Sequence, residues 1–238
     1  MQPVKLSGPE RLLKWVTGIC LIAAPLGSVV VTIAHPKTVN LGAPQLAIVA
    51  ANPGRWNAVH TLLFWDLALM VPAVLGLVRL LYARRPGAAL AGGALALLGI
   101  LAGAGAATDE LIVGVMAQME DSQAQMAALF DRVHGQGGFF IFLLATFLPI
   151  GLMVLAWGLY RAGLATAWTA GAIGLGALLE ALGLPAALPA LALAGHVLEL
   201  VGMGWIGLEI LRQTDEQWAR PAPLDRPAAP RAVPATER

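Results

Sequence analysis

The chain has 238 residues, of which 58% are hydrophobic and only 12% are charged, and its formal net charge is +1. Soluble domains carry about 25% charged residues, so this composition excludes an ordinary soluble domain and is typical of a protein embedded in a lipid bilayer. The small net charge and the lack of any basic run in the sequence argue against nucleic acid as a partner.

Six apolar segments are long enough to cross a bilayer as helices, which takes about 20 residues each. They cover approximately residues 12–34, 59–82, 88–114, 139–160, 164–184 and 188–211. The predicted fold is therefore all-α, a polytopic bundle of six transmembrane helices in a single membrane domain over residues 1–212. The first segment follows three basic residues and could instead be a signal peptide. Its apolar run is longer than the about 7–15 residues of such a peptide, which favours an uncleaved helix.

The distribution of lysine and arginine predicts the orientation of the bundle. If the N-terminus is inside, twelve of the 15 basic residues lie on the inner side, and only Lys37, Arg55 and Arg132 lie on the outer side. Basic residues in short loops mark the cytoplasmic side of a membrane protein, so both termini are predicted to be cytoplasmic. Residues 213–238 are rich in proline and alanine and are predicted to form a disordered cytoplasmic tail.

The two long connections both fall on the predicted outer side. The second, "MEDSQAQMAALFDRVHGQGG", predicts a short amphipathic helix that begins after Asp121 or Ser122 and ends at Gly135. Its apolar stripe consists of Met126, Leu129, Phe130 and Val133. This helix is expected to lie on the outer membrane surface or to fold over the bundle.

Ionisable residues within the predicted spans concentrate in the outer half of the bundle. A charged side chain in a span costs at least about 2.5 kcal/mol, so it usually faces the bundle interior and marks a function. Glycines at helical spacing flank two of these positions, which indicates contact with another helix rather than with lipid. The residues predicted to line one outward-facing polar pocket are Asp66, Asp109, Glu110, Glu180, His196 and Glu199.

The pair His196 and Glu199 is spaced i, i+3, so both side chains project from one helix face. This spacing allows a hydrogen-bonded proton relay or a single metal ion such as zinc, with a third ligand from His60 or His134. Asp66, Asp109 and Glu180 are further candidates for that third ligand. Haem is disfavoured because no second histidine lies at the depth of His196. The pair could also be buried packing residues that only hold helices together.

The order of the segments resembles a broad group of uncharacterised bacterial six-helix membrane proteins known only as a domain of unknown function. The likeness includes the basic start, the long outer loop ending in "NPGRW", the inner turn with arginines and the outer amphipathic segment, over about Arg11 to Arg212. The resemblance implies location in the bacterial inner membrane and no established activity. It contains no diagnostic motif, so no residue roles are transferred.

These observations favour a binding or sensor subunit whose outer pocket holds a small ligand, a proton or a metal ion. A small proton-coupled transporter is an alternative, although the inner halves of the spans are nearly all apolar. A metal-dependent membrane enzyme is a second alternative, although the sequence has no Gly-x-Ser-x-Gly elbow for a nucleophile. A structural subunit of a membrane complex, partnered by another membrane protein as well as by the lipid bilayer, is the third.

Overall fold

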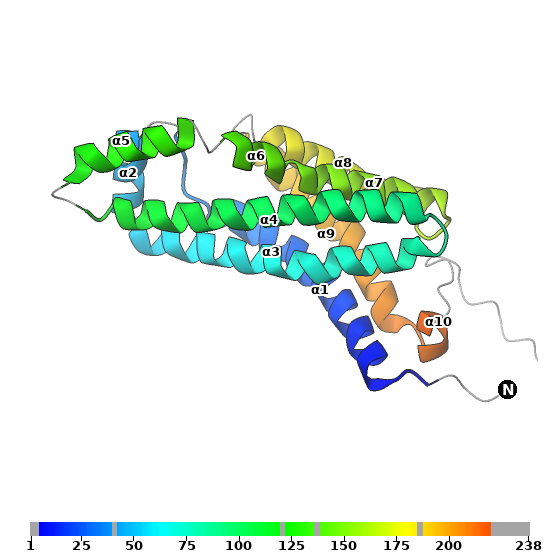
Figure 1. Ribbon diagram of the computed structural model, residues 1–238. Coiled ribbons are helices and arrows are strands. Elements are labelled where there is room, and N and C mark those ends of the chain that lie inside the picture. Colours follow the sequence, from blue (N-terminus) through cyan, green and yellow to red (C-terminus); the bar gives the residue numbers. More distant parts are fainter. Residues whose placement is uncertain (1–4, 40–41, 120–121, 136–138, 185–187, 220–238) are drawn as a thin grey trace, which may run out of the picture.

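The computed structural model describes residues 5–39, 42–119, 122–135, 139–184 and 188–219, and within these ranges the chain is helical with no strand. Several of the longer helices run back and forth along one axis, and the first helix crosses them obliquely (Figure 1). The described helices are α1 (Gly8–Ala34), α2 (Gly42–Ala51), α3 (Pro53–Tyr82), α4 (Pro86–Met116), α5 (Gln123–Val133), α6 (Phe139–Ala145), α7 (Phe147–Arg161), α8 (Ala167–Gly183), α9 (Pro189–Arg212) and α10 (Asp215–Ala219).

Five helical segments in the described ranges are long and apolar enough to cross a membrane. They are α1, α3, α4, the segment Leu143–Arg161 and α9. The chain is therefore a multi-pass membrane protein, as the composition predicts. The remaining predicted span, residues 164–184, corresponds to α8, which is apolar but has only 17 residues, or about 26 Å of helix.

The local sequence explains where most of these helices begin. Ser7 accepts a hydrogen bond from the backbone N–H of Glu10, and the Glu10 carboxylate accepts one from the Ser7 N–H, which is the reciprocal capping box. Proline at the first helical position starts α3, α4 and α9, where its missing N–H would have had no partner anyway. Pro149 cannot donate to the carbonyl of residue 145, and the helix breaks there between α6 and α7.

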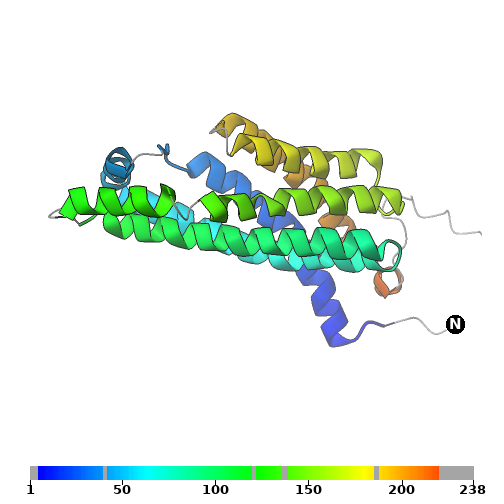
Figure 2. The same ribbon diagram turned by 45° about the horizontal axis from the view of Figure 1, so that its top comes forward.

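The six long helical segments pack as a closed ring in the order α1, α3, α4, α7, α8, α9 and back to α1 (Figures 1 and 2). Small residues allow the close approaches in this ring. A Cβ added to Gly207 of α9, for example, would lie 2.6 Å from the Gly18 carbonyl oxygen of α1. The core inside the ring is almost entirely aliphatic, which leaves its few polar side chains conspicuous.

One end of the bundle, here called the α5 end, carries a small cap. With 30 and 31 residues, α3 and α4 are each about 45 Å long, well beyond the about 30 Å of a hydrocarbon core. Their projecting ends pack with α2 and α5 around a second core centred on Leu46, Trp56 and Phe130 (Figure 2). The predicted amphipathic helix is thus present as α5, folded over the bundle.

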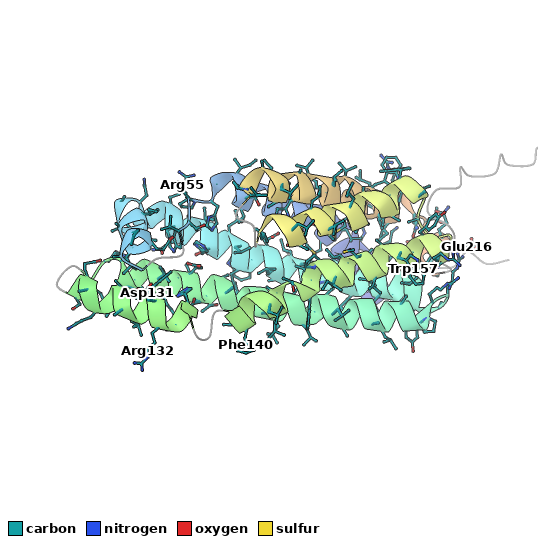
Figure 3. All side chains as sticks on the ribbon, turned by 90° about the horizontal axis from the view of Figure 1, so that it is seen from above. Arg55, Asp131, Arg132, Phe140, Trp157 and Glu216 are labelled. Carbon is teal, nitrogen blue, oxygen red and sulfur yellow. The ribbon has the colours of Figure 1, made fainter. Side chains whose placement is uncertain are left out.

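The orientation of α5 matches only half of its predicted apolar stripe. Phe130 is buried and Met126 packs against the cap core, but Leu129 and Val133 are exposed. Asp131 points to the opposite side of α5 from Arg132 (Figure 3), and its carboxylate accepts a 2.8 Å hydrogen bond from the Gly42 N–H at the start of α2. The face of α5 toward α2 therefore includes this carboxylate as well as apolar side chains.

The opposite end of the bundle, here called the α10 end, brings the two ends of the described chain together. Arg11 lies 3.6 Å from the Asp215 carboxylate, and the Lys14 ammonium donates to the Gln213 carbonyl. The guanidinium of Arg79 sits over the Trp218 ring at 4.1 Å from its centroid, and Trp218 is buried. The prediction that the tail is disordered from residue 213 is wrong for Asp215–Ala219, which form α10. Residues 220–238 of that tail lie outside the described residues.

We predict that α10 stabilises the bundle through Trp218. Replacing this buried ring by alanine removes its packing and the cation–π contact with Arg79, so Trp218→Ala should lower stability by about 3 kcal/mol or more. Trp157→Ala is the matched control, because Trp157 on α7 is 56% exposed. The measurement is unfolding of the detergent-solubilised protein by heat or by added denaturing detergent. Equal losses in the two variants would show that α10 is not docked.

Candidate functional site

The site depends on an unusually close approach between α8 and α9. A Cβ added to Gly176 would lie 2.7 Å from the Gly195 carbonyl oxygen and 2.8 Å from the Glu199 side chain, so the two backbones touch here. A Cβ on Gly195 would likewise lie 2.7 Å from the Gly176 carbonyl oxygen. The prediction that these glycines line a helix contact is confirmed, and the contact turns the neighbouring acidic side chains toward each other.

Three potential ligands meet at this contact. Glu180 of α8 and the pair His196 and Glu199 of α9 each offer one ligand atom, and these atoms all lie within 4.8 Å of one another. The Nδ1 atom of His196 is 3.5 Å from a carboxylate oxygen of Glu199. We call Glu180, His196 and Glu199 the buried trio, although Glu180 as a whole residue is only half-buried.

A fourth ionisable side chain faces the buried trio from the other side of the ring. Asp66 of α3 is 3% exposed and interacts electrostatically with His196, Glu180 and Glu199. The Ser28 hydroxyl of α1 donates a 2.7 Å hydrogen bond to one Asp66 carboxylate oxygen. Four helices of the ring therefore contribute polar side chains to one region of the core.

These side chains lie at nearly the same height along the bundle. Glu180 comes 13 residues after the start of α8 and Glu199 comes 13 residues before the end of α9, so each is about 20 Å above the α10 end. Asp66 comes 16 residues before the end of α3, or about 24 Å above it. The agreement of these heights, reached along three different helices, supports a single cluster.

Several buried polar atoms of this cluster have no hydrogen-bond partner among the described residues. Glu199 Oε1, Asp66 Oδ1 and His196 Nδ1 are buried and have no hydrogen-bond partner among the described residues. A buried polar atom without a partner costs about 1–3 kcal/mol, and more when it is charged. Purely structural packing residues would ordinarily be paired, so the free oxygens and nitrogen leave room for a bound proton or cation.

Two residues of the predicted pocket lie elsewhere. Asp109 sits 23 residues into α4, about 34 Å above the α10 end, and its carboxylate is 3.1 Å from the His134 Nε2 atom that follows α5. The backbone carbonyl of Glu110 accepts the Trp56 indole N–H of α3. These contacts tie Asp109 and Glu110 to the cap, so the structure separates the six predicted residues into two groups. Sequence positions place both residues near the outer end of their span, but they do not show that these residues contact the cap.

The two histidines predicted as third metal ligands also have other neighbours. His134 faces Asp109, and the His60 Nε2 atom faces that of His35 at 3.2 Å. The position of the third ligand is instead occupied by Glu180, which was one of the further candidates. Ser28 was not predicted, although the sequence shows it as the only serine within the predicted spans. A Cβ on Gly27 would lie 2.5 Å from Asp66 Oδ1.

Comparisons with protein-family models, with curated proteins and with solved structures found no match for this chain. The resemblance described above therefore rests on the order of the segments alone. The argument about function depends on the geometry of the cluster.

We predict that the glycine contact between α8 and α9 sets the geometry of the buried trio. Gly176→Ala would push the added methyl group into the Gly195 carbonyl and the Glu199 side chain, which should cost about 1–3 kcal/mol of stability. Gly174→Ala on the same helix is the control, since its nearest contact would be an ordinary 3.9 Å to the Ala156 methyl. Thermal unfolding in detergent measures both. A Gly176→Ala protein as stable as the Gly174→Ala protein would contradict the close approach.

Proposed function

We propose that this protein binds one divalent metal ion of the zinc class inside the membrane, through Glu180, His196 and Glu199. The observation that carries the proposal is the convergence of three ligand atoms within 4.8 Å of one another. One imidazole nitrogen and two carboxylate oxygens form a donor set that suits Zn²⁺ and related first-row ions. Ligands about 2.0–2.2 Å from a tetrahedral ion are about 3.3–3.6 Å apart, which is close to the 3.5 Å between His196 and Glu199.

Charge balance supports a bound cation. The buried trio brings two carboxylates into an apolar core, and isolated carboxylates are very unfavourable there. A divalent ion would neutralise both and use the Glu199 oxygen that lacks a hydrogen bond. Asp66 would then lie beside the ion as a further acid, oriented by Ser28, and would complete the coordination through water or hold a proton.

A proton-binding role is the second candidate, and one observation favours it. Carboxylate oxygens of Glu180 and Glu199 lie within 4.8 Å of each other, and a proton shared between them would relieve the repulsion of two ionised carboxylates. In that role the cluster would take up and release protons without a metal. Both roles use the same side chains, so the experiment below separates them.

The core beneath the cluster favours a closed binding site over a transport path. Toward the α10 end, the buried core that follows the cluster is mostly apolar, with Leu21, Met70, Val74, Leu77 and Met203, and its buried polar residues are Lys14, Thr17 and Thr169. Among the described residues no buried acid or histidine continues through this layer, as a path for coupled protons would require. We therefore propose a binding or sensor subunit rather than a transporter or an enzyme.

Two apolar cavities of the described protein lie away from the cluster. One is lined by residues of α7 and α8 and the other by residues of α3 and α4, and the linings are apolar. The buried trio and Asp66 are not part of either lining. A ligand the size of an ion fits the cluster better than a larger molecule.

We also propose the number of membrane spans and the orientation of the chain in the membrane. Since α7 and α9 both run from the α5 end to the α10 end (Figure 1), α8 must run back across the membrane between them, which gives six spans. The N-terminal segment and α10 meet at one end. By the positive-inside rule that end is cytoplasmic, which would open the cap and α5 to the outside of the bacterial inner membrane.

We predict that the purified protein binds Zn²⁺ or Co²⁺ tightly and that Glu199→Gln weakens this binding at least about 100-fold, since even changes behind the ligands cost about 10–100-fold. Glu180→Gln and His196→Ala should have effects of the same order. Glu209→Gln is the matched control, because Glu209 is on the same helix but pairs with exposed Arg212 at 3.4 Å. Calorimetric titration of chelator-treated protein, purified through a tag without histidine, provides the measurement.

The outcomes distinguish the two roles. Metal binding lost in the three trio variants and kept in Glu209→Gln supports the metal site. A second outcome is that neither the wild type nor any of the four variants binds metal tightly, and that proton uptake on acidification depends on Glu180 and Glu199. The metal proposal is then wrong and the proton role stands. Unchanged metal and proton binding in all variants would mean that the cluster only packs the helices.

A further inference from the structure

A second group of potential metal ligands lies nearer the α5 end, between α1 and α3. His35 is the C-cap residue of α1 and His60 is on α3, and their Nε2 atoms are 3.2 Å apart. His60 is buried and His35 is half-buried. His60 comes 22 residues before the end of α3, about 33 Å above the α10 end, and so about 9 Å farther along the helix than Asp66.

Hydrogen bonds on the opposite sides of the two rings fix which nitrogen carries the proton. His35 Nδ1 lies 2.7 Å from the Pro36 carbonyl oxygen, and His60 Nδ1 lies 2.8 Å from the Trp56 carbonyl oxygen. A carbonyl oxygen can only accept, so both Nδ1 atoms must donate. In neutral rings both Nε2 atoms then carry lone pairs, and these face each other. A histidine that binds a metal through one nitrogen usually donates the other N–H to just such a carbonyl.

Either a shared metal ion or a direct hydrogen bond would relieve the repulsion between the two lone pairs. The distances between the nitrogens and between the ring centroids favour the metal ion. Two imidazoles on one tetrahedral zinc, with bonds of about 2.0–2.1 Å, have nitrogens about 3.3 Å apart and ring centroids about 5 Å apart. The observed values are 3.2 Å and 4.9 Å. Two rings joined head-on by a linear N–H···N hydrogen bond of the same length would have centroids about 5.5 Å apart. Adjacent ligands of a square-planar ion would have nitrogens only about 2.8 Å apart.

The surroundings hold both rings in place. The Trp56 ring lies 4.4 Å from the His60 ring and 5.7 Å from the His35 ring, measured between centroids, and its own N–H is bound to the Glu110 carbonyl. The guanidinium of Arg55 donates a hydrogen bond to the Ala34 carbonyl and so fixes the C-terminal end of α1. The C-terminal end of a helix also carries a partial negative charge, which favours a cation there.

We infer that His35 and His60 form a second metal site, which takes a tetrahedral ion such as Zn²⁺ through their two Nε2 atoms. This site is independent of the buried trio. Among the described residues, no third histidine, cysteine or acidic side chain lies close enough to complete it. Water or a second ligand molecule would therefore fill the remaining positions. Two protein ligands make a weak and readily exchanged site, unlike a closed structural one.

The test is a titration of the full-length, chelator-treated protein with Co²⁺, whose visible absorption reports tetrahedral coordination. His35→Gln and His60→Gln keep polar side chains of similar size but remove the imidazole nitrogens, and each should lose one bound equivalent. His134→Gln is the control, because His134 is at the same end of the bundle but faces Asp109, and it should lose none. A wild-type protein with both sites binds two equivalents and the Glu199→Gln protein binds one.

The pattern of losses separates this inference from the proposed function. If His60→Gln loses an equivalent and Glu199→Gln loses none, the second site stands and the buried trio fails as a metal site. If His35→Gln and His60→Gln both bind as much Co²⁺ as the wild type, the second site is overturned. Should neither variant fold, X-ray absorption of the Glu199→Gln protein carrying one equivalent of zinc decides. It should show imidazole nitrogens at about 2.0 Å, and a signal without imidazole would overturn the inference.

Discussion

The backbone contact between α8 and α9 is the constraint on which the cluster depends. With Gly176 against Gly195, the two helices approach until a carbonyl oxygen of one meets the α-carbon of the other. Helices normally pack about 8–10 Å apart, with side chains between them. Removing those side chains is what allows Glu180 to reach His196 and Glu199 across the interface. The abundance of glycine in these two helices therefore positions functional groups in addition to allowing dense packing in lipid.

The second constraint is electrostatic. Within an apolar ring, two glutamates, an aspartate and a histidine cannot all keep their ordinary charges without compensation. Ser28 satisfies one oxygen of Asp66, and no comparable neutral donor is recorded for the free oxygen of Glu199 among the described residues. The sequence thus places together ionisable side chains that destabilise the fold when no proton or ion is bound to them. Arrangements of that kind are retained where binding a proton or an ion recovers the free energy, which is why we interpret the cluster as a site.

Much of this organisation follows from the sequence, and the parts that do not have identifiable physical causes. Composition predicts the helical membrane fold, and depth along each span places Glu180, His196 and Glu199 in the same half of the bundle. Flanking glycines predict which face turns inward. Sequence position did not separate Asp109 from the cluster, because that separation depends on its contact with His134, the residue that follows α5. These are tertiary contacts that helical periodicity does not contain.

The histidine pair escaped sequence analysis for a related reason. His35 stands at the predicted water boundary, where a histidine is usually solvated, and His60 seemed to start a span. In the structure α3 begins at Pro53, so His60 is about two turns inside the helix and faces the end of α1. The polar groups between α1 and α3 then occupy two successive levels, the His35–His60 pair and the Ser28–Asp66 pair. The second of these levels adjoins the buried trio.

This arrangement of levels also limits what the protein can do. Polar side chains continue from the cap to the buried trio, and beyond it the core is closed by Leu21, Met70 and Leu77. An ion that entered from the α5 end would meet ligands at two depths and an apolar barrier behind them. As we propose, such a column would load and hold an ion, while the described core toward the α10 end has only Lys14, Thr17 and Thr169 as buried polar residues. Occupancy of the buried trio would then act on the rest of the protein through the α8–α9 contact, since the same residues that bind the ion set the distance between those two helices.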